Sequence, residues 1–269
     1  MKKLLPLIKW SGSKRSQAEE IIGLFPDTVN TYYEPFLGGG SILGAFSPKK
    51  AICGDVCQAL IELWKLAQTK PDLVHSEYKK RWEKLQKDKH PFYYEVRSRF
   101  NKKQSPHDLL FLTRTCVNGL IRFNRKGEFN NSLHYSRKGI HPENLRNIAK
   151  TWSNKIESYS FDVKHYFDLT KKAGKNDFVY LDPPYFNTRG RYFGKIDFTE
   201  FLKYLEDLNN RKIRFALSFD GARGEKSYIV KLPKKLYKRH HLIHSGNSTF
   251  NKVQNGKVEK VYESIYLNY

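Results

Sequence analysis

The tetrapeptide Asp182-Pro183-Pro184-Tyr185 carries residue types that can do chemistry on an amino group. Asp182 offers a carboxylate, and two proline rings fix the backbone so that the Pro183 carbonyl can be a second hydrogen-bond acceptor. Two acceptors aimed at the N–H bonds of an exocyclic amine draw its nitrogen toward tetrahedral geometry and free its lone pair. Tyr185 adds a flat face on which a base taken out of its stack can lie. The pattern is typical of a pocket that binds a nucleobase whose amino group accepts a methyl group.

A plainer reading is that Asp-Pro-Pro only ends a strand, since proline cannot continue a ladder and aspartate is common in turns. The preceding run 177–181 is short and apolar, which predicts a buried strand of a parallel sheet. The tetrapeptide then lies at a carboxyl strand end, where open α/β sheets bind ligands. The choice between the two readings depends on whether a cofactor site lies elsewhere in the chain.

Such a site is indicated by residues 31–42, which read as a strand, a glycine-rich turn and the apolar start of a helix. This device brings backbone N–H groups to a polar or anionic ligand, but it lacks the Gly-Lys-Ser/Thr ending of a phosphate loop. Asp55 ends the next strand about 20 residues further on, where nucleoside-binding folds contact ribose hydroxyls. An aspartate there also suits a helix N-cap, and both roles are compatible. In the loop 9–14, Trp10 could stack on a flat ligand and Lys14 could meet its carboxylate, although a lone tryptophan often fills a core.

The composition predicts a folded protein with a polyanionic partner. The chain has 269 residues, 39% of them hydrophobic, and 49 Lys or Arg against 27 Asp or Glu give a net charge of +22. The segment 70–150 alone contains 19 basic and 8 acidic residues. Solubility is the alternative explanation for the charge as a whole.

Residues 70–150 have basic helical stretches with interleaved aromatics, followed by a turn-rich segment, 118–132, that predicts a hairpin carrying Arg and Asn side chains outward. Those side chains read guanine and adenine edges in the major groove. We therefore predict a DNA-recognition insert at 70–150 within a catalytic domain formed by 1–69 and 151–269. The alternative is an ordinary helical insertion with solvated charges.

The α/β alternation resumes after the insert. Strands are expected at 156–161, 213–219, 236–244 and 258–269, and helices at 17–24, 56–68 and 201–208. The loop 186–197, which includes Arg189, could close over an extruded base.

Other patterns narrow the class of protein. Cys53, Cys57 and Cys116 lack zinc-ligand spacing, which indicates a reducing compartment and no metal site. No apolar run reaches the length of a membrane span, and the N-terminus is too short and interrupted for a signal peptide. We expect a cytoplasmic protein of bacterial or phage origin that associates with the nucleoid through DNA.

Five segments, taken together and in order, resemble the Dam-type, α-group DNA adenine-N6 methyltransferases. They are Lys9-Trp10-x-Gly12-x-Lys14, Glu34-Pro35-Phe36-x-Gly38-x-Gly40-Ser41, Asp55, Asn118-Gly119-Leu120-x-Arg122-x-Asn124 and Asp182-Pro183-Pro184-Tyr185. The resemblance spans nearly the whole chain. It implies a Rossmann-like class I fold with a mixed seven-stranded sheet and an inserted, mainly helical recognition subdomain with a β-hairpin.

The resemblance also implies S-adenosylmethionine as methyl donor, double-stranded DNA as partner, and roles for individual residues. Asp182, Pro183, Pro184 and Tyr185 would be catalytic and grip a flipped adenine. The cofactor would be held by Trp10, Lys14, Glu34, Phe36, Gly38, Gly39, Gly40, Asp55 and Asp162. DNA would be contacted by Lys9, Asn118, Leu120, Arg122, Asn124, Ser132 and Arg189. We expect a monomer, with a cognate restriction endonuclease as a further partner to test.

Two departures bear on the recognition sequence. Ser132 replaces a proline of the family's Phe-Asn-x-Pro, and His134-Tyr135-Ser136 stands where Gly-Arg-Tyr is common. The sequence predicts a short site with guanine and adenine, GATC being the leading one. Methylation of RNA adenine or of a protein glutamine is an alternative, although those enzymes usually begin the catalytic turn with Asn. A catalytically silent DNA-binding protein is another, although the intact tetrapeptide argues against it.

Overall fold

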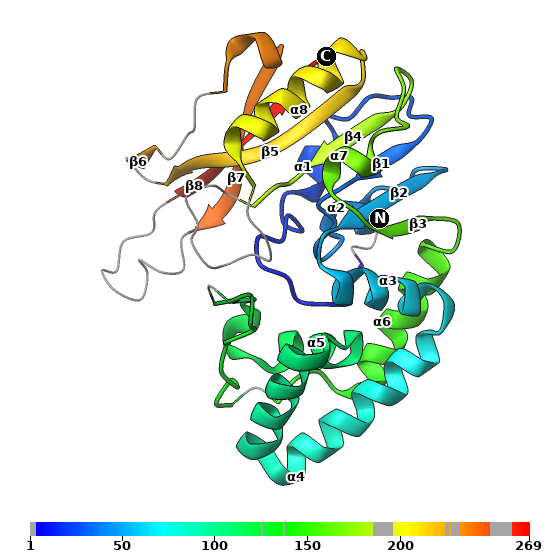
Figure 1. The fold of residues 1–269 in the computed structure, drawn as a ribbon, viewed down its shortest axis with the longest axis vertical. Coiled ribbons are helices and arrows are strands. Elements are labelled where there is room, and N and C mark those ends of the chain that lie inside the picture. The colour runs from blue at the N-terminus through cyan, green and yellow to red at the C-terminus, as the bar shows by residue number, and fades with distance from the viewer. Residues whose placement is uncertain are drawn as a thin grey trace.

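The computed structural model describes residues 4–124, 126–136, 138–184, 196–223, 226–227, 232–247 and 260–269. Its centre is one twisted sheet with strand order β3-β2-β1-β4-β5-β8-β7, and a two-residue β6 pairs with β5 (Figure 1). The strands are β1 Tyr32–Glu34, β2 Ala51–Asp55, β3 Ser160–Val163, β4 Phe178–Leu181, β5 Arg214–Arg223, β6 Lys226–Ser227, β7 Arg239–Asn247 and β8 Lys260–Leu267.

The five strands from β3 to β5 are parallel, and β8 runs antiparallel to both of its neighbours, β5 and β7. The mixed seven-stranded path confirms the predicted Rossmann-like α/β fold. All residues of β1 and β4 are buried, which explains the uninterrupted apolar and aromatic sequence of β4; β1 has two tyrosines and ends at the buried Glu34. Because the chain runs outward from β1 to β3 and then returns to β4 on the other side, the topological switch point lies between β1 and β4.

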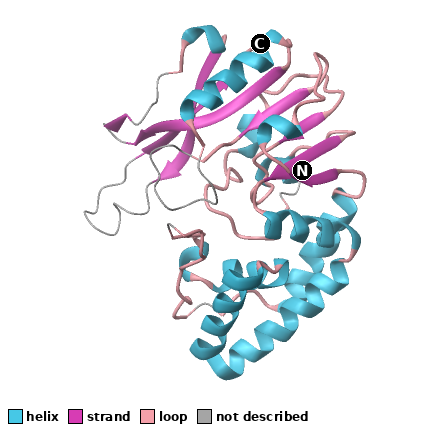
Figure 2. Cartoon of the chain, in the orientation of Figure 1, coloured by secondary structure: helices cyan, strands magenta, loops and turns pink. Residues whose placement is uncertain are grey.

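Helices cover both faces of the sheet (Figure 2). On one face, α8 (Phe198–Asn210) packs Phe201, Tyr204 and Leu208 against strands β4 and β5, and the short α7 (Tyr166–Leu169) joins the same apolar cluster. The spacing of those α8 side chains follows one helical face. On the other face lie α1 (Ala18–Ile22), α2 (Ser41–Ala45) and α3 (Gln58–Thr69).

The segment between α3 and β3 forms a helical lobe beyond one edge of the sheet domain, with α4 (Pro71–Lys103), α5 (Pro106–Thr115) and α6 (Pro142–Lys155) (Figure 1). Its aromatic residues Tyr78, Phe92, Tyr93 and Phe100 are buried and belong to the same apolar cluster as α3. The aromatics therefore build the core of the lobe. The proposed boundary after residue 150 falls inside α6, so this helix joins the lobe to the sheet domain.

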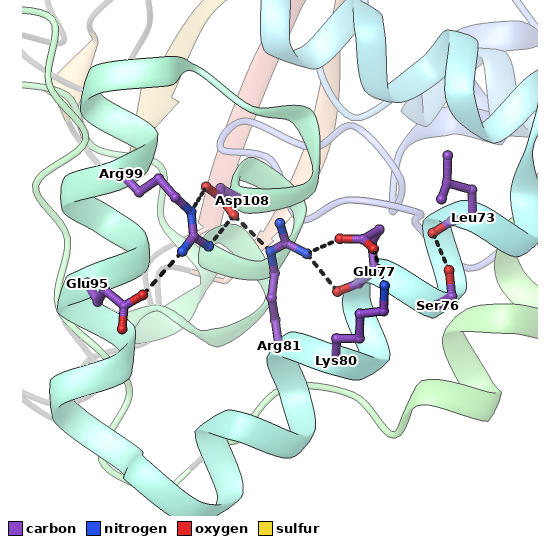
Figure 3. Close-up of polar contacts among 8 residues, drawn as sticks. All are labelled: Leu73, Ser76, Glu77, Lys80, Arg81, Glu95, Arg99 and Asp108. Carbon is purple, nitrogen blue, oxygen red and sulfur yellow. Dashed lines mark hydrogen bonds and ion pairs between the residues drawn. The ribbon is translucent and has the colours of Figure 1, made fainter.

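A buried carboxylate shows that α4 folds back on itself near Pro91, an internal proline. Arg81 and Arg99 each donate at 2.8 Å to Asp108, which has no exposed surface (Figure 3). A straight helix with a rise of about 1.5 Å per residue would separate the two arginines by about 27 Å. Proline removes a backbone donor and clashes with the preceding turn, which explains the bend. The three ionised side chains hold α5 against both arms of α4.

The turn-rich segment forms the predicted hairpin-like structure, with isolated antiparallel bridges between Cys116 and Leu133 and between Phe123 and Phe129. Asn124 and Glu128 face each other at the tip, where the Asn124 N–H donates to the Glu128 carbonyl at 2.9 Å. The Asn118-Gly119 pair lies in a short 3-10 helix instead, Val117–Gly119.

Several boundaries differ from the sequence prediction. The strand expected from residue 156 begins at Ser160, because α6 continues to Lys155 and ends with Ile156 as its C-cap. The strand expected from residue 236 begins at Arg239, because Lys234–Leu236 form a 3-10 helix after Pro233. In the part of the chain that is described, no helix is both long and apolar enough to cross a membrane.

Candidate active site

A cavity of about 920 Å³, partly open to solvent, lies at the carboxyl ends of β1, β2 and β4. This is the switch point at which open α/β sheets bind ligands. Its lining comes from six parts of the chain: residues 10–14, residues 34–39 with Ser41 and Ile42, residues 55–56, residues 165–166, residues 182–184, and Ile196. The fold thus brings the predicted cofactor turn and the predicted catalytic turn into one cavity.

The glycine turn is held from both sides. Its Gly38 N–H donates to Asp55 Oδ2 at 3.2 Å, and its Gly38 carbonyl accepts from Trp64 at 3.1 Å. Gly38 has a left-handed φ of 49°, and a Cβ there would lie 2.7 Å from the Trp10 ring, so only glycine fits. Asp55 Oδ1 also accepts from the Cys57 N–H at 3.0 Å, where α3 begins. Asp55 therefore braces the start of this helix as well as lining the cavity, and burial raises its pKa to about 6.

Glu34 is a buried carboxyl group at the end of β1 and lines the same cavity. Burial raises its pKa to about 8, with a further increase from the nearby Asp182, while a hydrogen bond from the Tyr32 hydroxyl at 2.9 Å opposes the shift. Glu34 is therefore protonated at neutral pH.

Asp182 is the first residue after β4, and its carboxylate is paired with Lys14. The Lys14 ammonium lies 2.9 Å from Asp182 Oδ1 and 2.6 Å from Glu263 Oε1. Burial raises the pKa of Asp182 to about 6, Lys14 acts in the opposite direction and Glu263 raises it further. Asp182 is thus mostly ionised at neutral pH, although it lies in a site that favours its neutral form.

Glu263, on β8, was missed by the sequence analysis. It is 5% exposed and reaches the catalytic turn through Lys14. The available signal was an acid in the otherwise apolar or weakly polar run 261–267, because an acidic side chain rarely lies buried in a strand without a partner.

Other predicted cofactor residues divide into two groups. Trp10, Phe36 and Gly39 line the cavity, and the Phe36 ring packs on Tyr166 at 5.3 Å. Gly40 lies behind this wall against Trp64, where a Cβ would be 3.0 Å from the ring.

Asp162 is not among the cavity-lining residues. Its side chain is 40% exposed and lies 3.4 Å from Lys164. The residues that line this end of the cavity are Val56 and His165, with Tyr166 beside them. Among the catalytic residues, Pro183 and Pro184 line the cavity, whereas Tyr185 lies outside the described residues, as does Arg189.

The structure gathers four of the predicted DNA-contacting residues near the hairpin. Lys9 packs against Gly119, at which a Cβ would lie 2.5 Å from Lys9 Cδ. Asn118, Leu120 and Arg122 are exposed around it. Glycine is required at 119 by this close approach and by its left-handed φ of 62°.

The other two described candidates have different surroundings. The Asn124 side chain accepts from the backbone N–H groups of Lys126 and Glu128, at 2.9 and 3.0 Å, and so stabilises its own turn. Ser132 is exposed, and its carbonyl accepts from Val117 at 2.9 Å.

Ser11 joins this hairpin to the cavity. Its hydroxyl accepts from the Ile121 N–H at 3.0 Å and donates to the Ile121 carbonyl at 3.4 Å, and Ser11 lines the cavity beside Trp10. The hairpin and the cofactor loop are therefore connected by side-chain hydrogen bonds as well as by the packing of Lys9 on Gly119.

Comparison with known proteins decides the family. The family model of the D12 class N6 adenine-specific DNA methyltransferases matches residues 10–249. The chain belongs to this family. It is 31% identical to the type II methyltransferase M.MjaIII of Methanocaldococcus jannaschii over 299 residues, covering 98% of this chain and 99% of that protein.

Two further relatives match over different lengths. The DNA adenine methylase of Vibrio cholerae is 29% identical over 69% of this chain and 66% of its own length. The type II methyltransferase M.FokI of Planomicrobium okeanokoites is 26% identical over 97% of this chain and 43% of its own length. Among solved structures, the rRNA methyltransferase aviRa of Streptomyces viridochromogenes covers 98% of this chain and 86% of its own length, at 12% identity and a TM-score of 0.42. That likeness is too remote to carry an argument.

As a member of this family, the protein is an adenine-specific DNA methyltransferase that uses S-adenosylmethionine. The cavity fits that cofactor chemically: Asp55 offers acceptors for a ribose diol, aromatic rings are among its walls, and carboxylates suit a sulfonium cation. Within the described residues, no group of three or more His, Cys, Asp or Glu is arranged to hold a metal ion.

Proposed function

We propose that the protein methylates N6 of an extruded adenine within a short double-stranded DNA site that contains guanine and adenine, with GATC as the leading candidate. The observation that carries this proposal is the Asp182 carboxylate, which lies at the end of β4 inside the cavity that the glycine turn also lines.

In the proposed mechanism, Asp182 accepts one N–H of the target amine and the Pro183 carbonyl accepts the other. Bound S-adenosylmethionine would supply an activated methyl group and leave as a neutral thioether; the surplus proton of the methylated amine is then released to solvent, so no strong base is needed. The two acceptors strengthen their hydrogen bonds as positive charge develops on the amine nitrogen, and they keep its lone pair directed at the methyl group. Asp182 must be ionised for this role, and its pKa of about 6 leaves it ionised at neutral pH.

In this proposal, different walls of the cavity bind different parts of the cofactor. We assign the ribose hydroxyls to Asp55, and the methionine part to the glycine turn with Phe36 and Trp10. The cofactor adenine is assigned to Val56 and His165, in place of Asp162, because these residues line the cavity and Asp162 does not.

We assign adenine stacking to Tyr185 and DNA contact to Arg189, from the sequence alone. Stacking on an aromatic ring contributes roughly 1–3 kcal/mol per base. Tyr185→Ala should therefore lower turnover more on a paired adenine than on an adenine opposite an abasic site, where extrusion costs less.

The DNA is read, in this proposal, by the surface that Lys9, Asn118, Leu120 and Arg122 form. A positively charged residue that pairs with a guanine edge contributes about 1–3 kcal/mol of discrimination. Arg122→Ala should weaken binding to the cognate site by that amount and relax the preference at one base pair. The exposed basic residues of 70–150 also predict affinity that falls steeply with salt.

One assay tests the reaction and its substrate together. Purified protein and radiolabelled S-adenosylmethionine are incubated with duplexes carrying GATC, with duplexes in which each base of that site is changed, with RNA and with protein extract. Label confined to adenine N6 in a duplex supports the proposal, and the preferred duplex defines the site. Label on RNA or protein alone, or on nothing, overturns it.

Two of the three relatives are named type II methyltransferases, which supports a search for a cognate restriction endonuclease. We propose that the enzyme itself acts as a monomer. Sedimentation of the protein with and without a single-site duplex tests this directly.

A further inference from the structure

The side chain of Glu263 is buried and reaches the catalytic turn through the Lys14 ammonium. It comes from β8, whereas Asp182 follows β4, and β5 lies between these strands. Lys14 joins the two carboxylates, at 2.6 Å from Glu263 and 2.9 Å from Asp182. A buried charge without a partner is costly. The contact of two acids with one lysine at these short distances is therefore a specific arrangement.

The strand geometry explains why Glu263 points there. Side chains alternate along β8, so Glu263 shares a face with Ile265 and Leu267, which pack in the same cluster as Leu7 and Ile21 of the N-terminal segment. Next to Glu263, the pairing register with β5 shifts between Phe219 and Gly221, opposite this residue. A bulge bends a strand and redirects its neighbours, and such bulges are frequent beside active sites.

The Lys14 ammonium contacts at least three acceptors in the described residues. They are Asp182 Oδ1, Glu263 Oε1 and, at 3.4 Å, the carbonyl of Gly12 in the same loop. The ion pair engages Oδ1 of Asp182, and the second oxygen, Oδ2, is then the acceptor for the target amine. Without Glu263, a flexible lysine side chain would lose the contact that fixes its ammonium on one side.

We propose that Glu263 is a positioning residue for methyl transfer: it holds the Lys14 ammonium against one oxygen of Asp182 and so fixes the other oxygen for the adenine amine. This inference rests on the proposed catalytic role of Asp182. Glu263 touches neither substrate nor cofactor in this scheme and acts only through Lys14.

The charges around Asp182 determine the sign of the expected effects. In the described part of the chain, the titratable groups that face it are Lys14 from the N-terminal loop, Glu34 from β1, Tyr180 from β4, whose hydroxyl is 2.6 Å from Ser218, and Glu263 from β8. At neutral pH, Glu34 and Tyr180 are mostly neutral, because burial raises both of their pKa values. Of the described groups, Lys14 lowers the pKa of Asp182 and Glu263 raises it.

Substitutions of Glu263 and Lys14 should shift the pH dependence of turnover in opposite directions. Since turnover requires ionised Asp182, it falls as the pH drops through the pKa of this carboxylate, about 6 in the wild-type protein. Glu263→Gln removes a repelling charge, so the acid limb of kcat should move to lower pH. Lys14→Met removes an attracting charge, so the limb should move to higher pH.

The experiment compares the full-length wild type, Glu263→Gln, Glu263→Asp, Lys14→Met and the control Ser264→Ala, which alters the next residue of β8 on its opposite face. Methyl transfer to a cognate duplex is measured from pH 5 to 9, together with KM for S-adenosylmethionine and the melting temperature. We expect Glu263→Gln to lower kcat about 100-fold, the loss typical of a misplaced reacting group, with KM within about threefold of wild type. Glu263→Asp should recover part of kcat, and Ser264→Ala should match wild type.

Wild-type turnover in Glu263→Gln, or shifts of the acid limb in the same direction for Glu263→Gln and Lys14→Met, overturns the inference. If Glu263→Gln does not fold, Glu263→Asp and Lys14→Met decide: an unchanged acid limb in Lys14→Met then refutes it. Failure of the wild type to label any DNA is a separate result, which refutes the proposed function itself.

Discussion

Two regions of this molecule contain a buried carboxylate, and their surroundings shift its pKa in opposite directions. In the helical lobe, burial alone would raise the pKa of Asp108, but hydrogen bonds from Arg99 and Arg81 lower it (Figure 3). In the cavity, Asp182 has one lysine that it shares with Glu263, and its pKa is raised to about 6.

The difference indicates the role of each carboxylate. Asp108 has no exposed surface and accepts three hydrogen bonds from two arginines, so it holds α5 to the two arms of α4 and is out of reach of a substrate. Asp182 lines the cavity, and its carboxylate is paired with one lysine, which only partly offsets the effect of burial on its pKa. Such partial compensation is common where a group must interact with a ligand.

The largest expected effect is on turnover at Asp182. Asp182→Asn keeps the shape but removes the charge, so the hydrogen bond to the amine weakens as that nitrogen becomes positive. We expect kcat to fall by more than about 1000-fold, in line with the loss of a preorganised charge-stabilising group. Cofactor affinity, measured by calorimetry, should change by less than about threefold, since Asp55 and the glycine turn remain. Turnover near the wild-type value would contradict the catalytic role of Asp182, and with it the contrast drawn with Asp108.

The second expected effect is on stability at Asp108. Asp108→Asn removes the charge shared by two arginines and replaces one acceptor oxygen with a donor, and we expect a loss of about 3 kcal/mol in the free energy of unfolding, the low end for a broken buried pair because Arg99 can reach water. Chemical denaturation measures this loss.

The matched control uses the same arginine. Glu95→Gln removes a partly exposed carboxylate that lies 3.3 Å from Arg99, and it should cost no more than about 1 kcal/mol. Equal losses in Asp108→Asn and Glu95→Gln would contradict the assignment of a structural role to Asp108. Turnover per folded molecule should stay close to wild type in both variants.

The smallest expected effect is on the pH dependence of the free energy of unfolding. The sign of this dependence differs between the two regions. Glu34 has a raised folded pKa of about 8, so its contribution to stability is complete at low pH and is lost as the pH rises from about 4.5 to 8. Asp108 has a lowered pKa, so its contribution is present above the ordinary carboxyl range and is lost as the pH falls below it.

Glu34→Gln should therefore reduce the loss of stability between pH 5 and 8, by about 1 kcal/mol per pH unit, in ligand-free protein. Denaturation curves at several pH values measure the slope for wild type, Glu34→Gln and Asp108→Asn. An unchanged slope in Glu34→Gln over this range would show that its carboxyl group is ionised in the folded protein.

The sequence predicted those parts that depend on short segments. Apolar runs with β-branched and aromatic residues gave the central strands, because a strand buried on both faces needs them. The motif around Gly38 and the tetrapeptide beginning at Asp182 were both placed at carboxyl strand ends, and the sheet order brings them to one cavity. Boundaries were less well predicted where a helix cap or a 3-10 turn competed with a strand, as at Ile156 and Leu236.

By itself, then, the sequence determined the fold class and the chemical groups of the site, because strand periodicity, glycine turns and motif order are local properties of the chain. Only the tertiary structure decided that Glu263 reaches Asp182 through Lys14, that Lys9 packs on Gly119, and that Val56 and His165 rather than Asp162 line the cavity. The physical reason is that these contacts join positions from different elements, and their distances depend on strand register and helix packing, which no spacing along the chain specifies.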